Sequence, residues 1–480
     1  MAWPMSIFPL KVGLFSIGLS AYWEQFPGLL ERLSAYNEHF EEALQRPGVE
    51  IVNLGMVDSP EKGVEAGHLL RQADVDLIFL HASTYALSST VLPAVRRAKV
   101  PVIVLNLAPE AAIDYAAINA MGDRTAMTGE WLAYCGTCPV PEIANVFTRA
   151  GIRFHQVTGL LDRGDAAWDE IGAWMDAAMA AHAMEHNRLG LMGHYYSGML
   201  DIATDLTKVC SVFGTHVEML EVDELSGLRE TLGEDEISAQ LNTFDTTFDV
   251  QPDCDAAELR RAARTAAALD RLVEQHALTS LAYYYKGSGN PANEDTVSSI
   301  ILGTSLLTAR HIPVAGEYEV KNALAMKIMD AFGAGGSFTE QYAIDFNADT
   351  VLMGHDGPGH LAIAEGKAKV RPLGVYHGKV GKGLSIEMAV KHGPITILSV
   401  VEDAQAGFKL LVAEGESVAG PILEIGNTNS HYRFPAGARA FLNAWNGNGP
   451  AHHCATGVGH IAAKVEKLAA LLGLPMVRVC

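Results

Sequence analysis

Short runs of apolar, β-branched residues alternate with amphipathic stretches through the first third of the chain. The expected strands are KVGLFSIG, VEIVNLG, VDLIFLHA and VPVIVLNLA, and the expected helices between them are Trp23 to Leu44, Glu61 to Ala73 and Ser88 to Ala98. Near-continuous apolar strands are typical of parallel strands that are buried on both faces, with helices as the covering layers. The pattern therefore predicts an α/β fold that begins with a doubly wound parallel domain.

The alternation resumes near Asn187, after an alanine-rich segment from Asp165 to His186 that we expect to be a connecting helix. The expected strands here are RLGLMGHY, HVEMLEVDEL and LTSLAYYY, and the expected helices are Gly198 to Val212, Glu236 to Asn242, Ala256 to His276 and Thr296 to Ala309. This second series predicts another αβα domain.

From about Lys367 the pattern changes to short strands with Gly-rich turns at close intervals. These strands are KVRPLGVYHGKV, GLSIEMAV, GPITILSVVED, FKLLVAEGESV and HYRF, followed by helices Ala436 to Trp445 and Val458 to Leu472 and a last strand, PMVRVC. Such spacing predicts an antiparallel sheet or small barrel. We therefore expect two consecutive doubly wound αβα domains, a Rossmann-like (flavodoxin-like) one at residues 1–186 and a central one at 187–330, followed by a β-rich domain at 331–480.

Charge and hydropathy narrow the classes of partner. The chain has 480 residues and a formal net charge of -21, so we expect no nucleic-acid partner, because phosphate binding requires a basic face. No apolar run approaches the roughly eighteen residues of a membrane span, and the N-terminal MAWPMSIFPLKVGLF lacks a basic segment ahead of its apolar residues. We expect a cytoplasmic protein without a membrane partner.

The sequence gives little evidence for nucleotide binding or for redox chemistry. Ser-Ile-Gly-Leu-Ser follows the first expected strand in place of G-x-G-x-x-G, and the P-loop pattern does not occur, so we expect no organic cofactor. Six cysteines in so long a chain fit a reducing compartment. Cys135 and Cys138 have C-x-x-C spacing, but no second pair lies at zinc-ribbon distance, which favours a turn of small residues over a functional dithiol.

Candidate chemistry is concentrated between Ile312 and His360. Acidic and imidazole side chains occur there among glycines and apolar residues: Glu317, Glu319, Glu340, His355 and His360. A helix-like run from Val320 to Phe332 and a strand-like TVLMG separate them, so three different elements would bring them to one point. Oxygen and nitrogen donors near strand ends favour a metal site over a solvated surface.

Three short blocks resemble motifs of the L-arabinose isomerase and L-fucose isomerase superfamily, most closely its L-arabinose isomerase branch. AGEYEVK at residues 315–321 is similar to the family's A-G-E-G-D-W-K, GSFTEQY at 336–342 to T-S-F-M-E-D-Y, and GPAHH at 449–453 to G-G-A-H-H. The blocks follow one another in the family's order. Elsewhere the likeness lies in the order of elements more than in residues.

The resemblance implies a ligand set and an activity. It places metal ligands at Glu317, Glu340, His355 and His453, with Mn²⁺ as the cofactor and Co²⁺ or Mg²⁺ as substitutes. It also implies an aldose–ketose isomerase in which Glu317 and Glu340 are the catalytic acid–base pair. Further substrate-binding positions under this resemblance are Tyr342, His360, Tyr22 and His452.

The N-terminal sugar-contacting motif departs from the family. The family has G-S-Q-H-x-Y where this chain has Ser16 to Tyr22, SIGLSAY, and the family's inter-subunit His is replaced by Met121. Hydrogen bonds to the distal hydroxyls of the substrate must then differ, and such bonds discriminate between stereoisomers. The resemblance further implies a small sugar as substrate and a homo-oligomer, as a trimer, tetramer or hexamer.

Two other classes of function agree with the pattern. Tandem αβ domains also form the binding clefts of sugar-binding or sensor proteins. A divalent-metal-dependent hydrolase or lyase acting on a carbohydrate would use the same cation to activate water. The leading hypothesis is an isomerase of an aldopentose, L-arabinose-like, or a related sugar, acting through a cis-enediol(ate).

Overall fold

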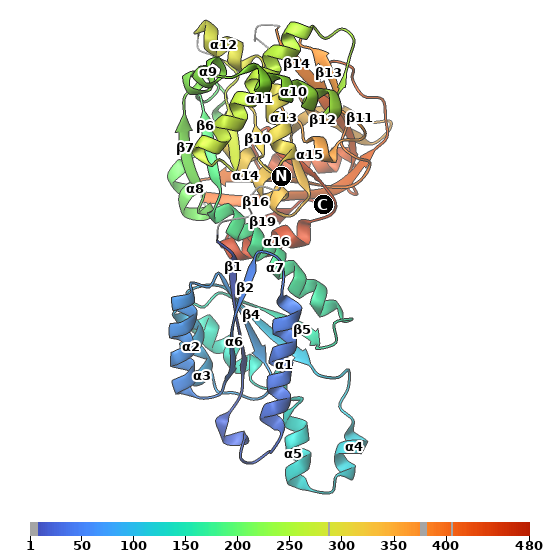
Figure 1. Ribbon diagram of the computed structural model, residues 1–480. Helices are drawn as coiled ribbons and strands as arrows, with labels where there is room; N and C mark the ends of the chain where they lie inside the picture. Colours follow the sequence, from blue (N-terminus) through green and yellow to red (C-terminus); the bar gives the residue numbers. More distant parts are fainter. Residues whose placement is uncertain (1–7, 287–288, 375–381, 405–406) are drawn as a thin grey trace. The chain divides into compact units, whose positions relative to one another are not determined.

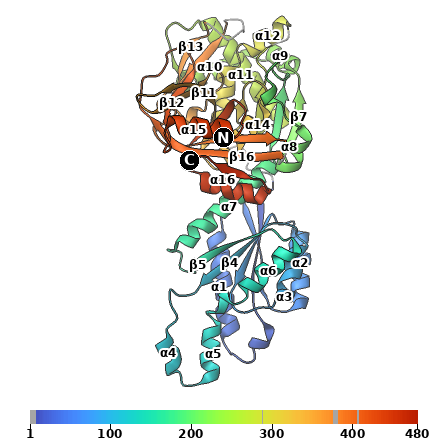
Figure 2. The same ribbon diagram turned by 180° about the vertical axis from the view of Figure 1, so that it is seen from behind.

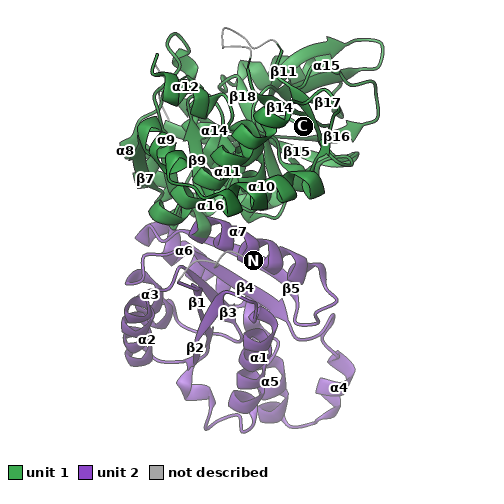
Figure 3. Cartoon of the chain, turned by 45° about the horizontal axis from the view of Figure 1, so that its top comes forward, with its two compact units in different colours: residues 1–3, 183–480 green, residues 4–182 purple. Residues whose placement is uncertain are grey.

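The computed structural model describes residues 8–286, 289–374, 382–404 and 407–480. The chain divides into two compact units, one that ends at His182 and one that begins at Ala183 (Figure 3). A further border at residue 330 inside the second unit stays a prediction. Among the described residues, no helix combines the length and the apolar character needed to cross a bilayer.

The first unit is built on a parallel sheet of five strands with the order β2-β1-β3-β4-β5. The strands are β1 (Leu10–Ile17), β2 (Val49–Val57), β3 (Leu77–Ala82), β4 (Val102–Ala108) and β5 (Phe154–Leu160). Four of them match the apolar runs of the sequence. The edge strand β5 was not predicted, because polar residues interrupt it and only Val157 is buried.

Helices cover both faces of this sheet, as Figures 1 and 2 show. Residues of α2 (Pro60–Ala73), α3 (Ser88–Arg96) and α6 (Val140–Ala150) share one core with Phe15, Ile78 and Val104 of the strands. On the other face, Phe40 of α1 (Leu29–Leu44) stacks on Trp168 of α7 (Ala166–Glu185), with 5.5 Å between ring centroids. The unit also contains η1 (Ser20–Tyr22), α4 (Tyr115–Ala120), α5 (Arg124–Leu132) and η2 (Cys135–Thr137).

The second unit begins with a parallel sheet of the order β10-β9-β6-β7. Its strands are β6 (Arg188–Met192), β7 (His216–Leu220), β9 (Ser280–Tyr283) and β10 (Val314–Ala315). Its helical segments are η3 (Leu200–Ile202), α8 (Leu206–Phe213), α9 (Val222–Glu230), α10 (Glu234–Thr247), α11 (Ala256–His276), α12 (Pro291–Val297) and α13 (Ile301–Ala309). The strand expected to run to Leu225 stops at Leu220, because Asp223 and Glu224 lie in the first turn of α9, where acidic side chains are favourable.

The C-terminal part closes into an antiparallel barrel of six strands, which confirms the predicted α/β architecture with a β-rich C-terminal region. The strands follow one another as β15 (Gly393–Asp403), β18 (His453–Val458), β11 (Gly335–Asp345), β12 (Thr350–His355), β17 (Thr428–Arg433) and β16 (Gly407–Val418). Pairing between β16 and β15 closes the ring, and β19 (Met476–Arg478) adds to β16 in parallel. Helices α15 (Ala438–Gly447) and α16 (Ala462–Leu472) complete this part.

A small sheet accompanies the barrel. It pairs β8 (Asp249–Val250) with β13 (Lys369–Pro372), and β13 with β14 (Leu384–Glu387). The short helix η4 (Leu361–Ile363) precedes β13 in the chain. The strand expected at residues 369–380 thus ends at Pro372, and residues 375–380 lie outside the described part of the chain.

Helix α14 (Val320–Ala331) links the parallel sheet to the barrel. Its residues from Val320 to Met329 are all buried, as expected of a helix enclosed on every side. It packs on β11, β15 and β18 of the barrel and on β9 and β10 of the sheet. The carboxyl end of β10 is thereby held close to the barrel strands.

Candidate metal centre

The register of three neighbouring barrel strands places three of the predicted ligands at one level. Glu340 in the middle of β11 lies opposite His453, the first residue of β18, and opposite Gly354 on the other side. His355 is the next residue after Gly354 and the last of β12. A Cβ at Gly354 would overlap the carbonyl oxygen of Thr428, so β12 lies unusually close to β17 just before His355.

Glu317 reaches this level from the parallel sheet. It follows β10 in a turn in which two successive non-glycine residues, Glu317 and Tyr318, have positive φ angles of 57° and 62°. Such residues cost about 1–3 kcal/mol each and persist only where surrounding structure holds them. Here the Tyr318 N–H donates to the carbonyl of Tyr283 at 2.8 Å. The fold thus maintains a strained turn that presents Glu317.

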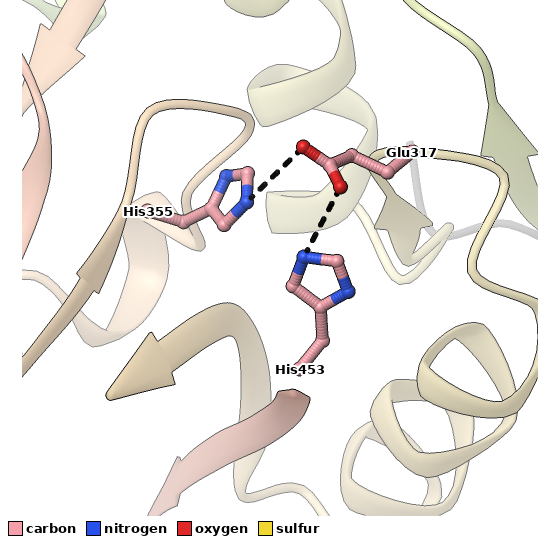
Figure 4. Close-up of side chains that lie close together, drawn as sticks. All are labelled: Glu317, His355 and His453. Carbon is pink, nitrogen blue, oxygen red and sulfur yellow. Dashed lines mark ion pairs between the residues drawn. The ribbon is translucent and has the colours of Figure 1, made fainter. Parts of the chain in front are cut away.

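Metal-ligand spacing occurs in two groups of three residues, which together include these four residues and His452. In the first, Glu317 Oε1 lies 3.9 Å from His355 Nε2, and Glu317 Oε2 lies 3.6 Å from His453 Nε2 (Figure 4). One ligand atom from each of these three residues lies within 4.8 Å of the others. Glu340, His452 and His453 form a second group by the same measure, so His453 belongs to both.

The surroundings of His453 favour a neutral ring that can donate a nitrogen lone pair to a metal. It is 1% exposed, and neither of its ring nitrogens makes a hydrogen bond with the residues that the structure describes. Burial, and then the nearby charge of His452, lower the pKa of His453 to about 3. The ring is held by Phe338, whose centroid is 4.5 Å away. A neutral imidazole keeps a lone pair for a cation, as metal binding requires.

Glu319 stands behind this ring. It is 0% exposed, and Oε2 lies 3.6 Å from His453 Nδ1, while Oε1 lies 3.8 Å from Lys321 Nζ. Burial raises the pKa of Glu319 to about 7. A carboxylate on the far nitrogen of a ligating histidine commonly orients it. On sequence grounds Glu319 was a candidate residue but not a predicted metal ligand. The sequence alone does not distinguish a glutamate that binds the metal from a nearby one that supports a ligand.

His452 is held at the rim by Asp201 of η3. Asp201 Oδ2 accepts from the His452 backbone N–H at 3.0 Å and lies 2.6 Å from His452 Nδ1. His452 Nε2 lies 3.8 Å from Glu317 Oε2. Burial works against the charged ring, but the carboxylates of Glu317 and Asp201 raise the pKa of His452 to about 9. Nothing in the sequence pointed to Asp201, which lies far from His452 along the chain.

Glu340 and Tyr342 lie two residues apart on β11, beside an irregularity in its pairing with β12 between Gln341 and Ala343. Burial raises the pKa of Glu340 to about 7; His452 opposes this shift, and Glu317 and Asp356 add to it. Burial, followed by the charge of Glu340, also raises the pKa of the Tyr342 phenol. The Tyr342 hydroxyl accepts from Asn427 Nδ2 at 3.1 Å. A carboxyl group with a pKa near neutrality can both accept and donate a proton.

Two further residues were expected to bind the substrate, His360 and Tyr22. His360 is buried beside Gly335 at the start of β11, away from Glu340 along the strand, and its N–H donates to Ser337 Oγ at 3.3 Å. Burial lowers the pKa of His360 to about 4. Tyr22 belongs to the first unit, where its ring packs edge-on against Phe26 at 5.8 Å. A role for either residue stays a prediction.

The donor set fits a divalent cation of the Mn²⁺, Co²⁺ or Mg²⁺ class. Each of the two groups offers one carboxylate and two imidazoles, and the buried nitrogens of His453 lack hydrogen bonds from the described residues. Leaving such groups without a partner costs about 1–3 kcal/mol each, which a bound cation would offset. Several divalent metals accept mixed carboxylate and imidazole ligands, so the coordination geometry and the metal's availability decide which one binds.

Residues 335–475 match the family model of the L-arabinose isomerase C-terminal domain. The match covers all six strands of the barrel and supports the expected relationship to the superfamily. No curated protein matches the chain. Among solved structures, the solute-binding protein of an ABC transporter from R. palustris in complex with benzoate is 14% identical, with 71% of this chain and 70% of that chain covered. Its TM-score of 0.17 is too low to inform the fold or function.

Proposed function

We propose that this chain is a metal-dependent aldose–ketose isomerase that interconverts an aldopentose, L-arabinose-like, or a related sugar and its ketose. The observation that supports the proposal is a pair of three-residue groups that share His453: one contains Glu317 and His355, the other Glu340 and His452. The match of residues 335–475 to an isomerase domain supports the same class of reaction.

Glu317, Glu340, His355 and His453 would hold the cation, for which we propose Mn²⁺, with Co²⁺ or Mg²⁺ as substitutes. When bound, a divalent cation polarises a carbonyl and stabilises developing negative charge, an effect on the order of several kcal/mol. Glu319 would fix the ring of His453 from behind, since its Oε2 faces Nδ1 at 3.6 Å.

The two carboxylates would carry the proton transfers. Isomerisation moves one proton between C1 and C2 and one between O1 and O2, through a cis-enediol(ate). One of Glu317 and Glu340 removes the carbon-bound proton while the other returns the oxygen-bound one, for an acceleration of roughly 10²–10⁴-fold. The pKa of about 7 suits Glu340 to both directions of transfer.

Residues at the rim would orient the sugar. The His452 ring, charged at neutral pH because of its raised pKa, can donate from Nε2 to a substrate oxygen. Tyr342, already anchored by Asn427, offers its hydroxyl near Glu340. The altered motif at Ser16 to Tyr22 and Met121 in place of the family's His would change the contacts to distal hydroxyls. We propose a homo-oligomer located in the cytoplasm.

A sugar panel tests the proposal. Aldopentoses, aldohexoses and deoxy-sugars are incubated with the protein and Mn²⁺ in deuterated water, before and after removal of metal by a chelator. An isomerase produces an equilibrium mixture of aldose and ketose and incorporates deuterium at C1 or C2, and loses both activities on chelation. Binding without either product would identify a sugar-binding protein. Bond cleavage with consumption of water would identify a hydrolase, and cleavage by elimination without consumption of water would identify a lyase. Isomerisation that survives complete chelation would reject the metal-dependent mechanism.

A further inference from the structure

A disulfide joins Cys135 and Cys138 in the first unit, where the sequence favoured a turn of small residues without chemistry. The turn consists of η2 and leads directly into α6, which begins at Val140. The two sulfur atoms have different surroundings. Cys135 is 3% exposed, whereas Cys138 is exposed. One sulfur of the bond therefore meets solvent and the other meets the core.

The residues between the two cysteines hold the turn in place independently of the disulfide. A Cβ at Gly136 would overlap the carbonyl oxygen of Ala82, so the turn packs directly on the end of β3. Thr137 Oγ1 donates to Asn106 Oδ1 at 2.9 Å, which ties it to β4. With these anchors intact, two thiols produced by reduction would remain close enough to bond again.

The surroundings also separate the chemical roles of the two sulfurs. Cys138 precedes an eleven-residue helix by two positions, and the positive end of a helix stabilises a thiolate, the form that exchanges with disulfides. Cys135 packs in an apolar cluster with Leu29, Leu33 and Leu132. Small thiols in solution can reach Cys138, whereas Cys135 is screened from them.

We propose that Cys135 and Cys138 are a redox-active pair that exchanges with small thiols and disulfides through Cys138. In reduction, a small thiolate attacks Cys138 Sγ, the bond between the protein sulfurs breaks, and Cys135 Sγ leaves with the electron pair and takes a proton. A second small thiolate attacks the small-molecule sulfur of the mixed disulfide and releases Cys138. Two small thiols become one small disulfide, so two electrons pass to the protein. Oxidation by a small disulfide runs the same steps in reverse.

The pair is separate from the candidate metal centre, since all groups of that centre belong to the second unit. In a reducing compartment most disulfides are transient and serve redox sensing or catalysis. Redox exchange at this turn requires none of the residues of the candidate metal centre.

Redox titration of the folded, full-length protein tests the inference. The protein is equilibrated with stepped ratios of reduced to oxidised glutathione, quenched with acid, alkylated after unfolding and analysed by peptide mass spectrometry. We expect the peptide with Cys135 and Cys138 to pass between disulfide and dithiol as the ratio changes. The exposed Cys210 serves as a single-thiol reference for ordinary reactivity. A pair that stays bonded until the protein unfolds, or that stays reduced at the most oxidising ratio, overturns the inference.

Two variants test the different roles. Cys135→Ser leaves Cys138, which should form a mixed disulfide with oxidised glutathione about tenfold faster than Cys210. Cys138→Ser leaves Cys135, which should react more slowly than Cys210. The reverse order of rates would contradict exchange through Cys138. If either variant does not fold, the wild-type titration still decides whether the pair is redox-active.

Discussion

The two parallel sheets place their first four strands in the same order, but they use the polar residues at their carboxyl edges differently. In the first unit, Ser16 Oγ lies 3.0 Å from His81 Nδ1 and accepts from Asn37 Nδ2 at 3.1 Å, and all three residues are buried. These groups satisfy one another. At the edge of the second sheet, Glu319 is fully buried, and neither of its oxygens accepts a hydrogen bond from the described residues.

The difference separates structural polar groups from functional ones. Buried polar groups in native proteins are nearly always hydrogen-bonded, so each exception requires an explanation. Ser16, Asn37 and His81 are buried and bonded to one another, so they are part of the core of the first unit. Glu319 and His453 are exceptions. A bound cation would give His453 a partner, while Glu319 Oε2 faces the other nitrogen of that ring at 3.6 Å. Topology alone thus does not identify a site. The second edge is distinguished by buried groups without hydrogen bonds that lie among residues with metal-ligand spacing.

The largest expected effect is on turnover. Glu340→Gln keeps the size of the side chain and removes its ability to transfer a proton, so kcat should fall by about 10²–10⁴-fold. The measurement is ketose formation from the sugar that the panel identifies. The exposed Glu365→Gln is the matched control and should leave kcat unchanged. A near-normal rate for Glu340→Gln would remove this residue from the acid–base pair.

The next effect distinguishes the two edges by metal affinity. His453→Asn should weaken Mn²⁺ binding by more than about 100-fold, because a ligand is lost where even supporting groups contribute 10–100-fold. His81→Asn, the same substitution at the other edge, should leave the affinity unchanged. Titration calorimetry with Mn²⁺ measures both. If the two variants bind Mn²⁺ equally well, the proposed functional difference between the edges is wrong.

A smaller effect is expected from the partner of His452. Asp201→Asn removes the charge that holds the His452 ring, and we expect kcat to fall by about tenfold while Mn²⁺ affinity changes little. Asp205→Asn is the control, since this carboxylate caps α8 by accepting from the N–H groups of Thr207 and Lys208. Asn caps a helix about as well as Asp, so this substitution should change neither stability nor kcat appreciably. Equal kinetic effects of both substitutions would indicate a general disturbance of this segment.

The smallest effect concerns the pH dependence of stability in the first unit. Burial lowers the pKa of His81 to about 3 in the folded state, below its ordinary 6.5, so the folded protein favours the neutral ring. The unfolded state therefore takes up a proton below about pH 6.5, and stability falls by up to about 1.4 kcal/mol per pH unit as the pH decreases toward 3. The free energy of unfolding, measured with urea between pH 7 and pH 4, should fall less steeply with decreasing pH for His81→Asn than for the wild type. Parallel curves would show that His81 is not the group responsible.

Local patterns were sufficient for most of the elements but not for all. The apolar runs of β1, β3 and β4 are longer than a turn and lie between amphipathic helices. Their hydrophobic pattern therefore predicts buried strands. Strand β5 was missed because His155, Gln156 and Thr158 interrupt its apolar pattern at the sheet edge. The strand predicted through Leu225 was too long because α9 begins at Val222, directly after Leu220 and Glu221, with Asp223 and Glu224 in its first turn.

By itself, the sequence determined the succession of parallel and antiparallel regions and the residue types of the candidate site, because hydrophobic period and motif composition are local properties of the chain. The tertiary structure decided which of these residues meet. The β11–β18 register sets Glu340 opposite His453, the left-handed turn presents Glu317, and η3 brings Asp201 to His452. These contacts join residues that are remote along the chain, and they depend on strand pairing and packing that no local pattern encodes. The same holds for Cys135 and Cys138, whose unequal exposure follows from how their turn packs on the sheet.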